Sequence, residues 1–352
     1  MKVFCLKETL ASLVLENLLK KKHEIVKRDE AEFVIDLLSK ENVKNLWLEK
    51  DRVESTKFYL RYGIKIPKTE FLNEKKEFSI PFVYKFSADS TLGPQTVVVK
   101  KEEDFQQLLF SNSIYKSENS IIQEYVVGRE FTVTVLVGEK NWIYIGVARD
   151  YKKLFDDETG PNTYGMGSIS PVKSHPNVES IIEVTLSALE KEGKKHKGFL
   201  SFQFIENEDL FLLECNVRLC MPEFQSMSKL IDGDIAERLF DCYNGNYIKP
   251  LNFFQDKKSV TINLVSKTFP FEPQEKINLS FDDCEFEVIT DKSSGTWCNK
   301  TFIAGINNSG YESFDELSSE IYEHLKLFSQ TNLHFRKDIG KIACNEDEIV
   351  IQ

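Results

Sequence analysis

The chain has 352 residues, of which 41% are hydrophobic and 29% are charged. This composition is typical of a globular protein with two or three domains, and it excludes a disordered chain. The formal net charge of -11 disfavours binding to nucleic acid through a broad basic surface.

Cysteine usage and the first residues exclude several further classes. The seven cysteines form no CxxC pair, which argues against a zinc site and against a disulfide framework, and a reducing cytoplasm is the expected compartment. Lys7 and Glu8 interrupt the first apolar run, so it is not expected to be a signal peptide. No apolar run approaches the ~20 residues that cross a bilayer.

The first 50 residues alternate short apolar runs with helical patterns, which predicts a small parallel βαβαβ unit. The expected strands cover residues 2–6, 23–27 and 43–48, and the expected helices cover residues 10–21 and 30–39. No glycine precedes Gly63, which excludes a GxGxxG turn and makes a dinucleotide-binding role untenable. A charged helix over residues 50–62 is expected next, with Gly63 as its C-terminal cap.

The following hundred residues are predicted to be rich in strands. We expect strands at residues 82–85, 96–100, 120–126, 127–138 and 142–150, and a helix at residues 103–110. Lys85 ends the first of these strands, where a lone lysine is usually a solvated charge. Gln123, Glu124 and Glu130 flank a turn at Gly128. A polar hairpin edge explains these residues as well as a functional role does.

Two segments stand out as carriers of chemistry. Residues 150–171, DYKKLFDDETGPNTYGMGSISP, are predicted to form a long polar loop, which is too costly in conformational entropy to order without a use. Residues 213–225, LECNVRLCMPEFQ, begin as a strand that places Glu214, Asn216 and Arg218 on one face. Two oxygen ligands beside a guanidinium suit a magnesium-bound phosphate next to a carboxylate.

The remainder of the chain mixes helices and strands. We expect a helix at residues 178–193, a hairpin at residues 198–217 that turns near Asn207, and one helix at residues 222–243. The polar stretch 244–252 is the expected domain boundary. Strands are expected at residues 259–266, 284–290 and 296–308, and a helix at residues 314–329 that begins with a capping box of Ser313 and Glu316. Arg336, Lys337 and Lys341 form a basic cluster near the end.

Three of these segments together resemble the ATP-grasp ligases of the glycinamide ribonucleotide synthetase (phosphoribosylamine–glycine ligase) family. The family loop D-H-K-R…D-T-G-P-N-T-G-G-M-G-A-Y-S-P is similar to DYKKLFDDETGPNTYGMGSISP, and the family metal strand L-E-F-N-C-R-F-G-D-P-E-T-Q is similar to LECNVRLCMPEFQ. The family ending Y-R-R-D-I-G is similar to FRKDIG at residues 335–340. The three matches stand in the family order.

The resemblance implies an ATP-grasp fold of mixed α/β and α+β class, in which ATP lies between two lobes. It implies a shortened N-terminal parallel α/β domain at residues 1–50 and an ATP-grasp domain at residues 51–250, with its small lobe at about residues 70–130. A strand-rich, mixed β/α C-terminal domain would follow at residues 251–352.

The activity that the resemblance implies is the ATP-dependent joining of glycine to 5-phosphoribosylamine through a glycyl phosphate. The products would be glycinamide ribonucleotide, ADP and phosphate, as in purine biosynthesis, with magnesium or manganese as the metal. The expected partners are small-molecule substrates, with no nucleic acid and no membrane, in a cytoplasmic monomer or homodimer. Because acyl phosphates hydrolyse readily, a lid is needed, and residues 150–171 are the expected lid.

The resemblance also assigns roles to single residues. Glu214 and Asn216 would ligate the metal, and the catalytic residues would be Arg218, Asp150 and Lys152. The residues expected to bind ATP are Lys85, Gln123, Glu124 and Glu130. The residues expected to bind the other substrates are Gly160, Pro161, Asn162, Thr163, Gly165, Met166, Gly167, Arg336 and Lys337, the last two at the sugar phosphate.

The chain departs from the family pattern in four places. LGPQT at residues 92–96 lacks the lysine and second glycine of the family's glycine-rich loop, and Tyr164 replaces a glycine of the substrate loop. Cys220 and Met221 replace Gly-Asp, and LKETLA at residues 6–11 stands where a glycine-rich turn is expected in a longer N-terminal domain.

These departures leave three hypotheses open. The chain is a trimmed synthetase, a ligase of the same chemistry for another amine or amino acid, or a catalytically silent relative that binds ATP. Retention of Glu214, Asn216, Arg218 and the GPNT…GMG spacing weighs against the silent relative.

Overall fold

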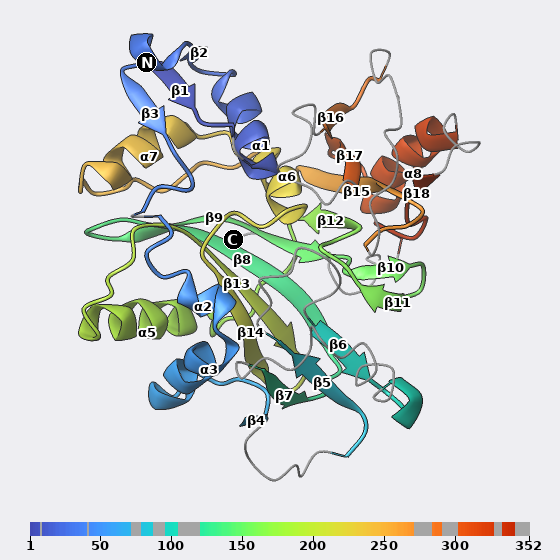
Figure 1. Cartoon of the computed structure of the whole chain (residues 1–352). Coiled ribbons are helices and arrows are strands. Elements are labelled where there is room, and N and C mark those ends of the chain that lie inside the picture. Colours follow the sequence, from blue (N-terminus) through green and yellow to red (C-terminus); the bar gives the residue numbers. More distant parts are fainter. Residues whose placement is uncertain are drawn as a thin grey trace.

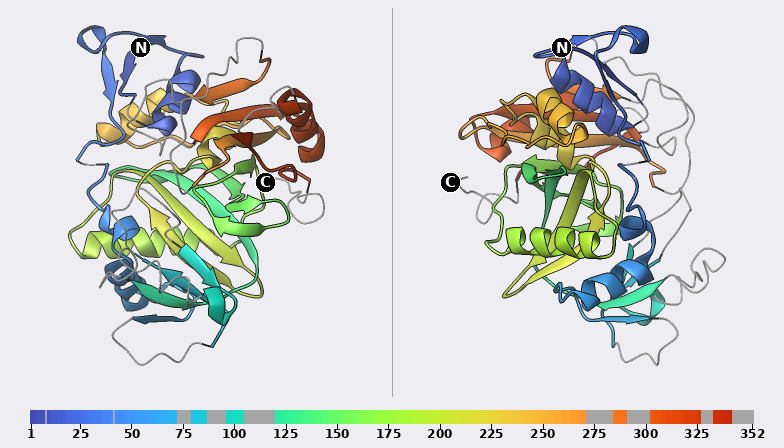
Figure 2. Two further views of the ribbon diagram at one scale, coloured as in Figure 1. Left: turned by 45° about the vertical axis from the view of Figure 1, so that its right-hand side comes forward. Right: turned by 90° about the vertical axis from the view of Figure 1, so that its left-hand side faces the viewer.

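The computed structural model describes residues 1–7, 9–40, 42–71, 79–86, 96–104, 120–270, 284–290, 302–326 and 333–341. In these residues a large antiparallel sheet runs through the middle of the molecule. A four-stranded antiparallel sheet and a three-stranded parallel sheet lie at opposite ends of it (Figures 1 and 2). No helix in the described part of the chain has the length and apolar character that a bilayer span requires.

The N-terminal sheet has β1 (Lys2–Cys5) between β2 (Glu24–Ile25) and β3 (Phe33–Ile35), all parallel. Helix α1 (Leu10–Leu19) begins with a capping box between Thr9 and Ser12. The predicted helix at residues 30–39 and strand at residues 43–48 are wrong. Phe33 and Ile35 are buried and Val34 is half-buried, which is the period-two pattern of a strand, whereas residues 42–46 form turns.

Two short helices connect this sheet to the next. Helix α2 (Trp47–Lys50) leads into α3 (Arg52–Arg61), and the Asp51 side chain caps α3 by accepting a hydrogen bond from the Glu54 amide at 3.0 Å. Gly63 follows α3 with a positive φ of 67°, so the prediction of a helix closed by this glycine is confirmed.

The four-stranded sheet has the strand order β4-β7-β5-β6. Its strands are β4 (Thr69–Phe71), β5 (Phe82–Lys85), β6 (Thr96–Val99) and β7 (Ile121–Glu124). Strands β5, β6 and β7 confirm the strands predicted at residues 82–85, 96–100 and 120–126. The helix predicted at residues 103–110 begins within the described residues, and its part after residue 104 lies outside them. Residues 92–95 of the LGPQT segment, which differs from the family's glycine-rich loop, also lie outside the described residues.

The large sheet has the order β14-β13-β8-β9-β12-β15-β17-β16, and β18 pairs with β15. Its strands in the described residues are β8 (Arg129–Val137), β9 (Trp142–Asp150), β12 (Gly167–Ser170), β13 (Gly198–Glu206), β14 (Leu210–Asn216), β15 (Lys258–Ser266), β16 (Glu287–Thr290), β17 (Phe302–Gly310) and β18 (Leu333–His334). The hairpin predicted at residues 198–217 is therefore confirmed as β13 and β14.

The segment at residues 150–171 is not the continuous loop that was predicted. It contains a separate hairpin of β10 (Lys153–Phe155) and β11 (Thr159–Asn162), followed by β12. Strand β12 pairs with β9 on one side and with β15 on the other, so it connects the central strands to the C-terminal strands. Small residues permit this insertion, because a Cβ atom on Gly167 would lie 2.4 Å from the Thr261 carbonyl oxygen.

Several helices in the described residues pack against the large sheet. Helix α5 (Val178–Lys191) shares one hydrophobic core with β8 and β13, and α8 (Phe314–Leu325) packs against β15 and β17 after the predicted capping box. The single helix predicted at residues 222–243 is wrong, because it is divided into α6 (Glu223–Ser228) and α7 (Ile235–Tyr243). Ile231 bridges to Phe253 between them, and Asp234 caps α7.

The Gly167→Ala substitution tests the β12 contact. The added methyl would meet the Thr261 carbonyl oxygen and the Ile339 side chain, so we expect a loss of about 1–3 kcal/mol in the free energy of unfolding. Thermal or urea unfolding measures this loss. Val184→Ala on the exposed face of α5 is the control and should stay within about 0.5 kcal/mol of the parent. Equal stability of the two variants would show that β12 moves away from β15 without cost.

Candidate active site

A cavity of about 960 Å³ lies between the four-stranded sheet and the large sheet. Strands β5, β6 and β7 line one side, and strands β9, β13 and β14 line the other. Residues 163–165, which follow β11, and Glu49, Lys50 and Arg52 also line it. The volume is at the upper end of the roughly 300–1,000 Å³ of small-molecule sites.

Most of the site residues expected from the sequence meet in this cavity. Those that line it are Lys85, Gln123, Glu124, Glu130, Asp150, Lys152, Asn162, Thr163, Gly165, Glu214, Asn216 and Arg218. Those outside its lining are Gly160, Pro161, Met166, Gly167, Arg336 and Lys337.

Strand β14 presents the candidate metal ligands. In the β13–β14 hairpin Glu214 pairs with Gln203, and Asn216 pairs with Ser201 at the end of the strand. Asn216 Nδ2 donates to Glu214 Oε1 at 3.2 Å, and Arg218 Nη2 donates to Asn216 Oδ1 at 3.4 Å. The alternation therefore brings the three side chains into one connected row, as expected for a strand.

Two charged residues that the sequence analysis missed fix this row from the α2–α3 segment. Arg52 Nη1 donates to Glu214 Oε2 at 2.6 Å. Glu49 accepts hydrogen bonds from Arg218 Nε at 2.8 Å and from the Val217 amide at 3.2 Å. A local signal exists for Arg52, because a cation at the first residue of a helix opposes the helix dipole. Glu49 carries no such signal.

Burial and charge set the protonation of Glu214 in this row and of Lys85, which lies beside it on β5. Burial opposes the ionisation of Glu214, but the charges of Arg52, Lys152 and Lys85 outweigh it and lower the pKa of this carboxyl. Lys85 donates to the Leu213 carbonyl oxygen at 3.0 Å, and burial lowers its pKa to about 7 despite the nearby Glu214. Glu214 is therefore ionised in the cavity, whereas Lys85 loses its proton more easily than an ordinary lysine.

The pKa of Lys152 is shifted in the opposite direction to that of Lys85. Its Nζ atom donates to Gln203 Oε1 at 2.6 Å and lies 3.4 Å from Glu130 Oε2. Burial disfavours the charged form, but the surrounding carboxylates, Glu130 first, raise the pKa above its usual value. Lys152 therefore remains a cation in this cavity.

Two carboxylate oxygens at the cavity have no hydrogen-bond donor among the described residues. One is Asp150 Oδ1, and the other is Glu223 Oε2, whose sister oxygen accepts from Thr132 Oγ1 at 3.1 Å. Burial, followed by the charge of Glu223, raises the pKa of Asp150 well above its usual value. Because unpaired buried acceptors are costly, the pair is suited to a cationic group of a ligand.

The loop after β11 lies directly against these carboxylates. Gly165 has a φ of 110°, and a Cβ atom there would lie 2.7 Å from Asp150 Oδ1 and 2.4 Å from Pro222 Cδ. Asn263 Nδ2 donates to the Gly165 carbonyl oxygen at 2.8 Å. Tyr164, the residue before Gly165, lines the cavity and is 46% exposed. The backbone at Gly165 thus approaches the site as only glycine permits.

Two of the residues expected to bind ATP, Gln123 and Glu124, have side chains that are already hydrogen-bonded at β4 and the residue before it. Gln123 Nε2 donates to Thr69 Oγ1 at 2.9 Å, and Glu124 Oε1 accepts from the Lys68 amide at 2.8 Å. Glu130 retains an accessible carboxylate, with 46% of its side chain exposed. Roles for these residues remain predictions.

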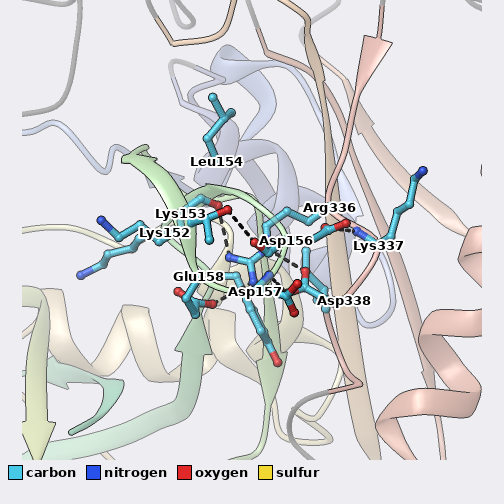
Figure 3. A network of polar contacts seen from close by, with 12 residues as sticks. Lys152, Lys153, Leu154, Asp156, Asp157, Glu158, Arg336, Lys337 and Asp338 are labelled. Carbon is cyan, nitrogen blue, oxygen red and sulfur yellow. Dashed lines mark hydrogen bonds and ion pairs between the residues drawn. The ribbon is translucent and has the colours of Figure 1, made fainter. Parts of the chain in front are cut away.

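Arg336 and Lys337, which were expected at a sugar phosphate, lie outside the lining of the cavity. The Arg336 side chain is fully buried and pairs with Asp338 and Glu158, as Figure 3 shows. Lys337 lies at a separate depression beside α8. The basic cluster of the sequence therefore does not form one anion site, because its arginine is neutralised inside the protein.

The chemistry of the donors at β14 suits a divalent metal. Within the described residues no group of three His, Cys, Asp or Glu side chains is arranged to hold a metal ion. Glu214 and Asn216 offer one carboxylate and one amide oxygen, and Mg²⁺ commonly completes such a partial set with phosphate oxygens and water. The residues therefore fit a metal that arrives with a nucleotide.

Comparisons with known proteins agree over most of the chain. Residues 52–224 match the family model described as "Phosphoribosylglycinamide synthetase, ATP-grasp (A) domain". The phosphoribosylamine–glycine ligase of Thermotoga maritima is 27% identical over 314 residues, which are 83% of this chain and 77% of that protein. The ligase of Fusobacterium nucleatum is 25% identical over 336 residues, which are 86% of this chain and 77% of that protein.

Solved structures carry the same fold. The crystal structure of the Thermotoga maritima phosphoribosylamine–glycine ligase superposes with a TM-score of 0.73 at 21% identity and covers 96% of this chain and 100% of that chain. The N5-carboxyaminoimidazole synthetase of Staphylococcus aureus complexed with ADP has a TM-score of 0.62 at 12% identity and covers 93% and 97%. The expected ATP-grasp fold is thereby confirmed, and residues 52–224 carry the ATP-grasp domain of the phosphoribosylglycinamide synthetase family model.

Proposed function

We propose that this ATP-grasp ligase joins glycine to 5-phosphoribosylamine and forms glycinamide ribonucleotide, ADP and phosphate. The observation that carries the proposal is the cavity itself, which combines the cations Lys152 and Arg218 with two carboxylate oxygens that have no donor among the described residues. Such a set matches an amino acid zwitterion next to a polyphosphate. The family relationship supports the same choice of substrates.

The amino acid would be recognised at both of its ends. Its ammonium group would donate to Asp150 Oδ1 and Glu223 Oε2, and its carboxylate would face Arg218. Arg218 is held by Glu49, whose charge raises the pKa of the guanidinium, so Arg218 is a fixed cation. This arrangement would hold the carboxylate in line for phosphorylation.

The nucleotide would lie against the four-stranded sheet. Lys85 would contact its phosphates, with Lys152 as a second cation for charge that develops during phosphoryl transfer. Magnesium bound at Glu214 and Asn216 would neutralise the phosphate charge. The loop at residues 163–165 would exclude water from the acyl phosphate, because it covers Asp150 closely. We also propose that the protein acts in the cytoplasm.

The decisive assay is ADP release from ATP and magnesium, with and without glycine plus freshly generated phosphoribosylamine, with the product mass determined. We expect ADP and glycinamide ribonucleotide only when both substrates are present. Glu214→Gln is the matched variant and should lower turnover at least 100-fold, about 2.7 kcal/mol, while the fold is retained. Release that depends on another amine or amino acid would replace these substrates, and ATP binding without turnover by any of them would reject the ligase activity.

Tyr164 favours the ligase for another substrate as the second candidate. Its ring lies at the cavity next to Gly165, where the family pattern has a small residue. A panel of amino acids and amines in the same assay distinguishes this candidate from the glycine ligase.

Lys85 generates a prediction about pH. Because burial holds its pKa at about 7, Lys85 is mostly neutral near pH 8 without ligand, and bound phosphates should return its proton. We therefore expect ATP binding near pH 8 to take up nearly one proton, and this uptake should vanish near pH 6. Calorimetry in buffers of different ionisation enthalpy measures it. Lys85→Arg keeps the charge at all these pH values, so undiminished uptake in this variant would assign the proton to another group.

Glu49 generates a prediction about substrate positioning. Glu49→Gln removes the charge that fixes Arg218, and we expect kcat/KM for the carboxylate substrate to fall about 10- to 100-fold, with the KM for ATP little changed. Steady-state kinetics measures the two parameters. Glu54→Gln, one turn further along the same segment and outside the cavity lining, is the control. A similar loss in both variants would mean that the segment acts through stability alone.

A further inference from the structure

We propose that Arg336 is a positioning residue that fixes the β10–β11 hairpin beside the candidate active site, and that Glu158 is the outer contact through which it does so. We call Arg336, Asp338 and Glu158 the Arg336 clamp. Its kinetic consequences rest on the proposed function, whereas its structural consequences do not.

Arg336 makes a complete set of contacts inside the protein. Its Nε and Nη2 atoms donate to the two oxygens of Asp338 at 2.8 and 2.6 Å. Nη2 also donates to Glu158 Oε1 at 2.8 Å, and Nη1 donates to the Lys153 carbonyl oxygen at 3.2 Å. The guanidinium lies 5.1 Å from the centre of the Tyr151 ring. Figure 3 shows Asp338, Glu158 and Lys153 around Arg336.

Further bonds connect the same two segments of chain. Asp338 Oδ2 accepts from the Asp157 amide at 2.9 Å, and the Lys337 amide donates to Asp156 Oδ1 at 2.7 Å. His334 Nε2 lies 2.8 Å from the Leu154 carbonyl oxygen. The C-terminal segment thus contacts both the strand and the turn of the hairpin, with Arg336 at the centre.

The turn of the hairpin needs such support. Asp157 and Glu158 have φ values of 56° and 53°, a left-handed conformation that residues with a side chain adopt at a cost. Two consecutive residues in this conformation persist where surrounding contacts hold them. The clamp supplies these contacts at both positions, through the Asp157 amide and the Glu158 carboxylate.

The hairpin in turn carries part of the cavity lining. Lys152 precedes β10, and Lys153, Glu158 and Asn162 belong to the hairpin and line the cavity. Asn162 Nδ2 donates to the Thr96 carbonyl oxygen of β6 at 3.3 Å. The hairpin therefore spans the distance from the clamp to the four-stranded sheet, and a displaced hairpin would move Lys152 from Gln203 and Glu130.

A direct phosphate contact by Arg336 is incompatible with this environment. Two carboxylates already neutralise the guanidinium, and its side chain is 0% exposed. Removing Arg336 from them would leave Asp338 buried without its cation, which is strongly unfavourable. The Lys337 side chain extends away from these carboxylates in Figure 3. A substitution of Lys337 therefore tests a neighbouring cation that does not take part in the clamp.

Hydrogen exchange measured by mass spectrometry tests the clamp without reference to activity. Glu158→Gln is the first variant, because the Glu158 side chain is 44% exposed and its replacement leaves the buried Arg336–Asp338 pair intact. Arg336→Lys is the second. We expect amide exchange in residues 153–163 to become at least about tenfold faster in both variants, with β13 unchanged, because local opening of the hairpin becomes more frequent.

Kinetics adds the readout that a purely stabilising role would not change. We expect both variants to lower kcat several-fold while the KM for ATP stays the same, because Lys152, the cation for charge that develops during phosphoryl transfer, loses its position. Lys337→Met is the matched control and should change neither exchange nor kcat. Unchanged exchange at residues 153–163, or equal acceleration across β13, overturns the proposal. A KM for the phosphorylated amine that rises in Lys337→Met and Arg336→Lys alike, without faster exchange, also overturns it and assigns both residues to the phosphate. If exchange accelerates locally but the parent protein turns over neither substrate, the clamp stands and the proposed function fails.

Discussion

The balance of buried charge in one cavity is the constraint on which the candidate site depends. An ionic group removed from water is tolerated only when a partner of opposite charge replaces the lost hydration. Glu214 meets this condition through Arg52, and the largely buried Glu49 pairs with the half-exposed Arg218. Both partners come from the α2–α3 segment, so this short connection between two sheets determines where the functional groups of β14 point.

The elements that the sequence predicted well are those whose signals are local. The bounds predicted for the strands at residues 82–85 and 142–150 are correct. Their signals are local, because they consist of the apolar run of each strand and the turn residues directly next to it. The capping box at Ser313 and the glycine after α3 are equally local. Glu214 and Asn216 belong here too, because alternation along one strand suffices to place them on one face.

Two of the errors, at β12 and at Arg336, have a common physical origin, which is contact between distant parts of the chain. Strand β12 consists of small and polar residues and looks like a loop, yet its position between β9 and β15 buries it. Arg336 looks the same in the sequence whether it binds an external phosphate or internal carboxylates. Its partner Glu158 is 178 residues away, so only the tertiary structure distinguishes these two roles.

The remaining imbalance in the cavity indicates what a ligand must bring. The cations Arg52, Lys152 and Arg218 each have a bonded acceptor, whereas Asp150 and Glu223 each retain a carboxylate oxygen that no described residue donates to. The raised pKa of Asp150 expresses the cost of that arrangement. A ligand with an ammonium group relieves it, while a simple carboxylic acid adds a further negative charge and leaves both oxygens unpaired. Discrimination between these ligands therefore follows from the unpaired acceptors rather than from the size of the cavity.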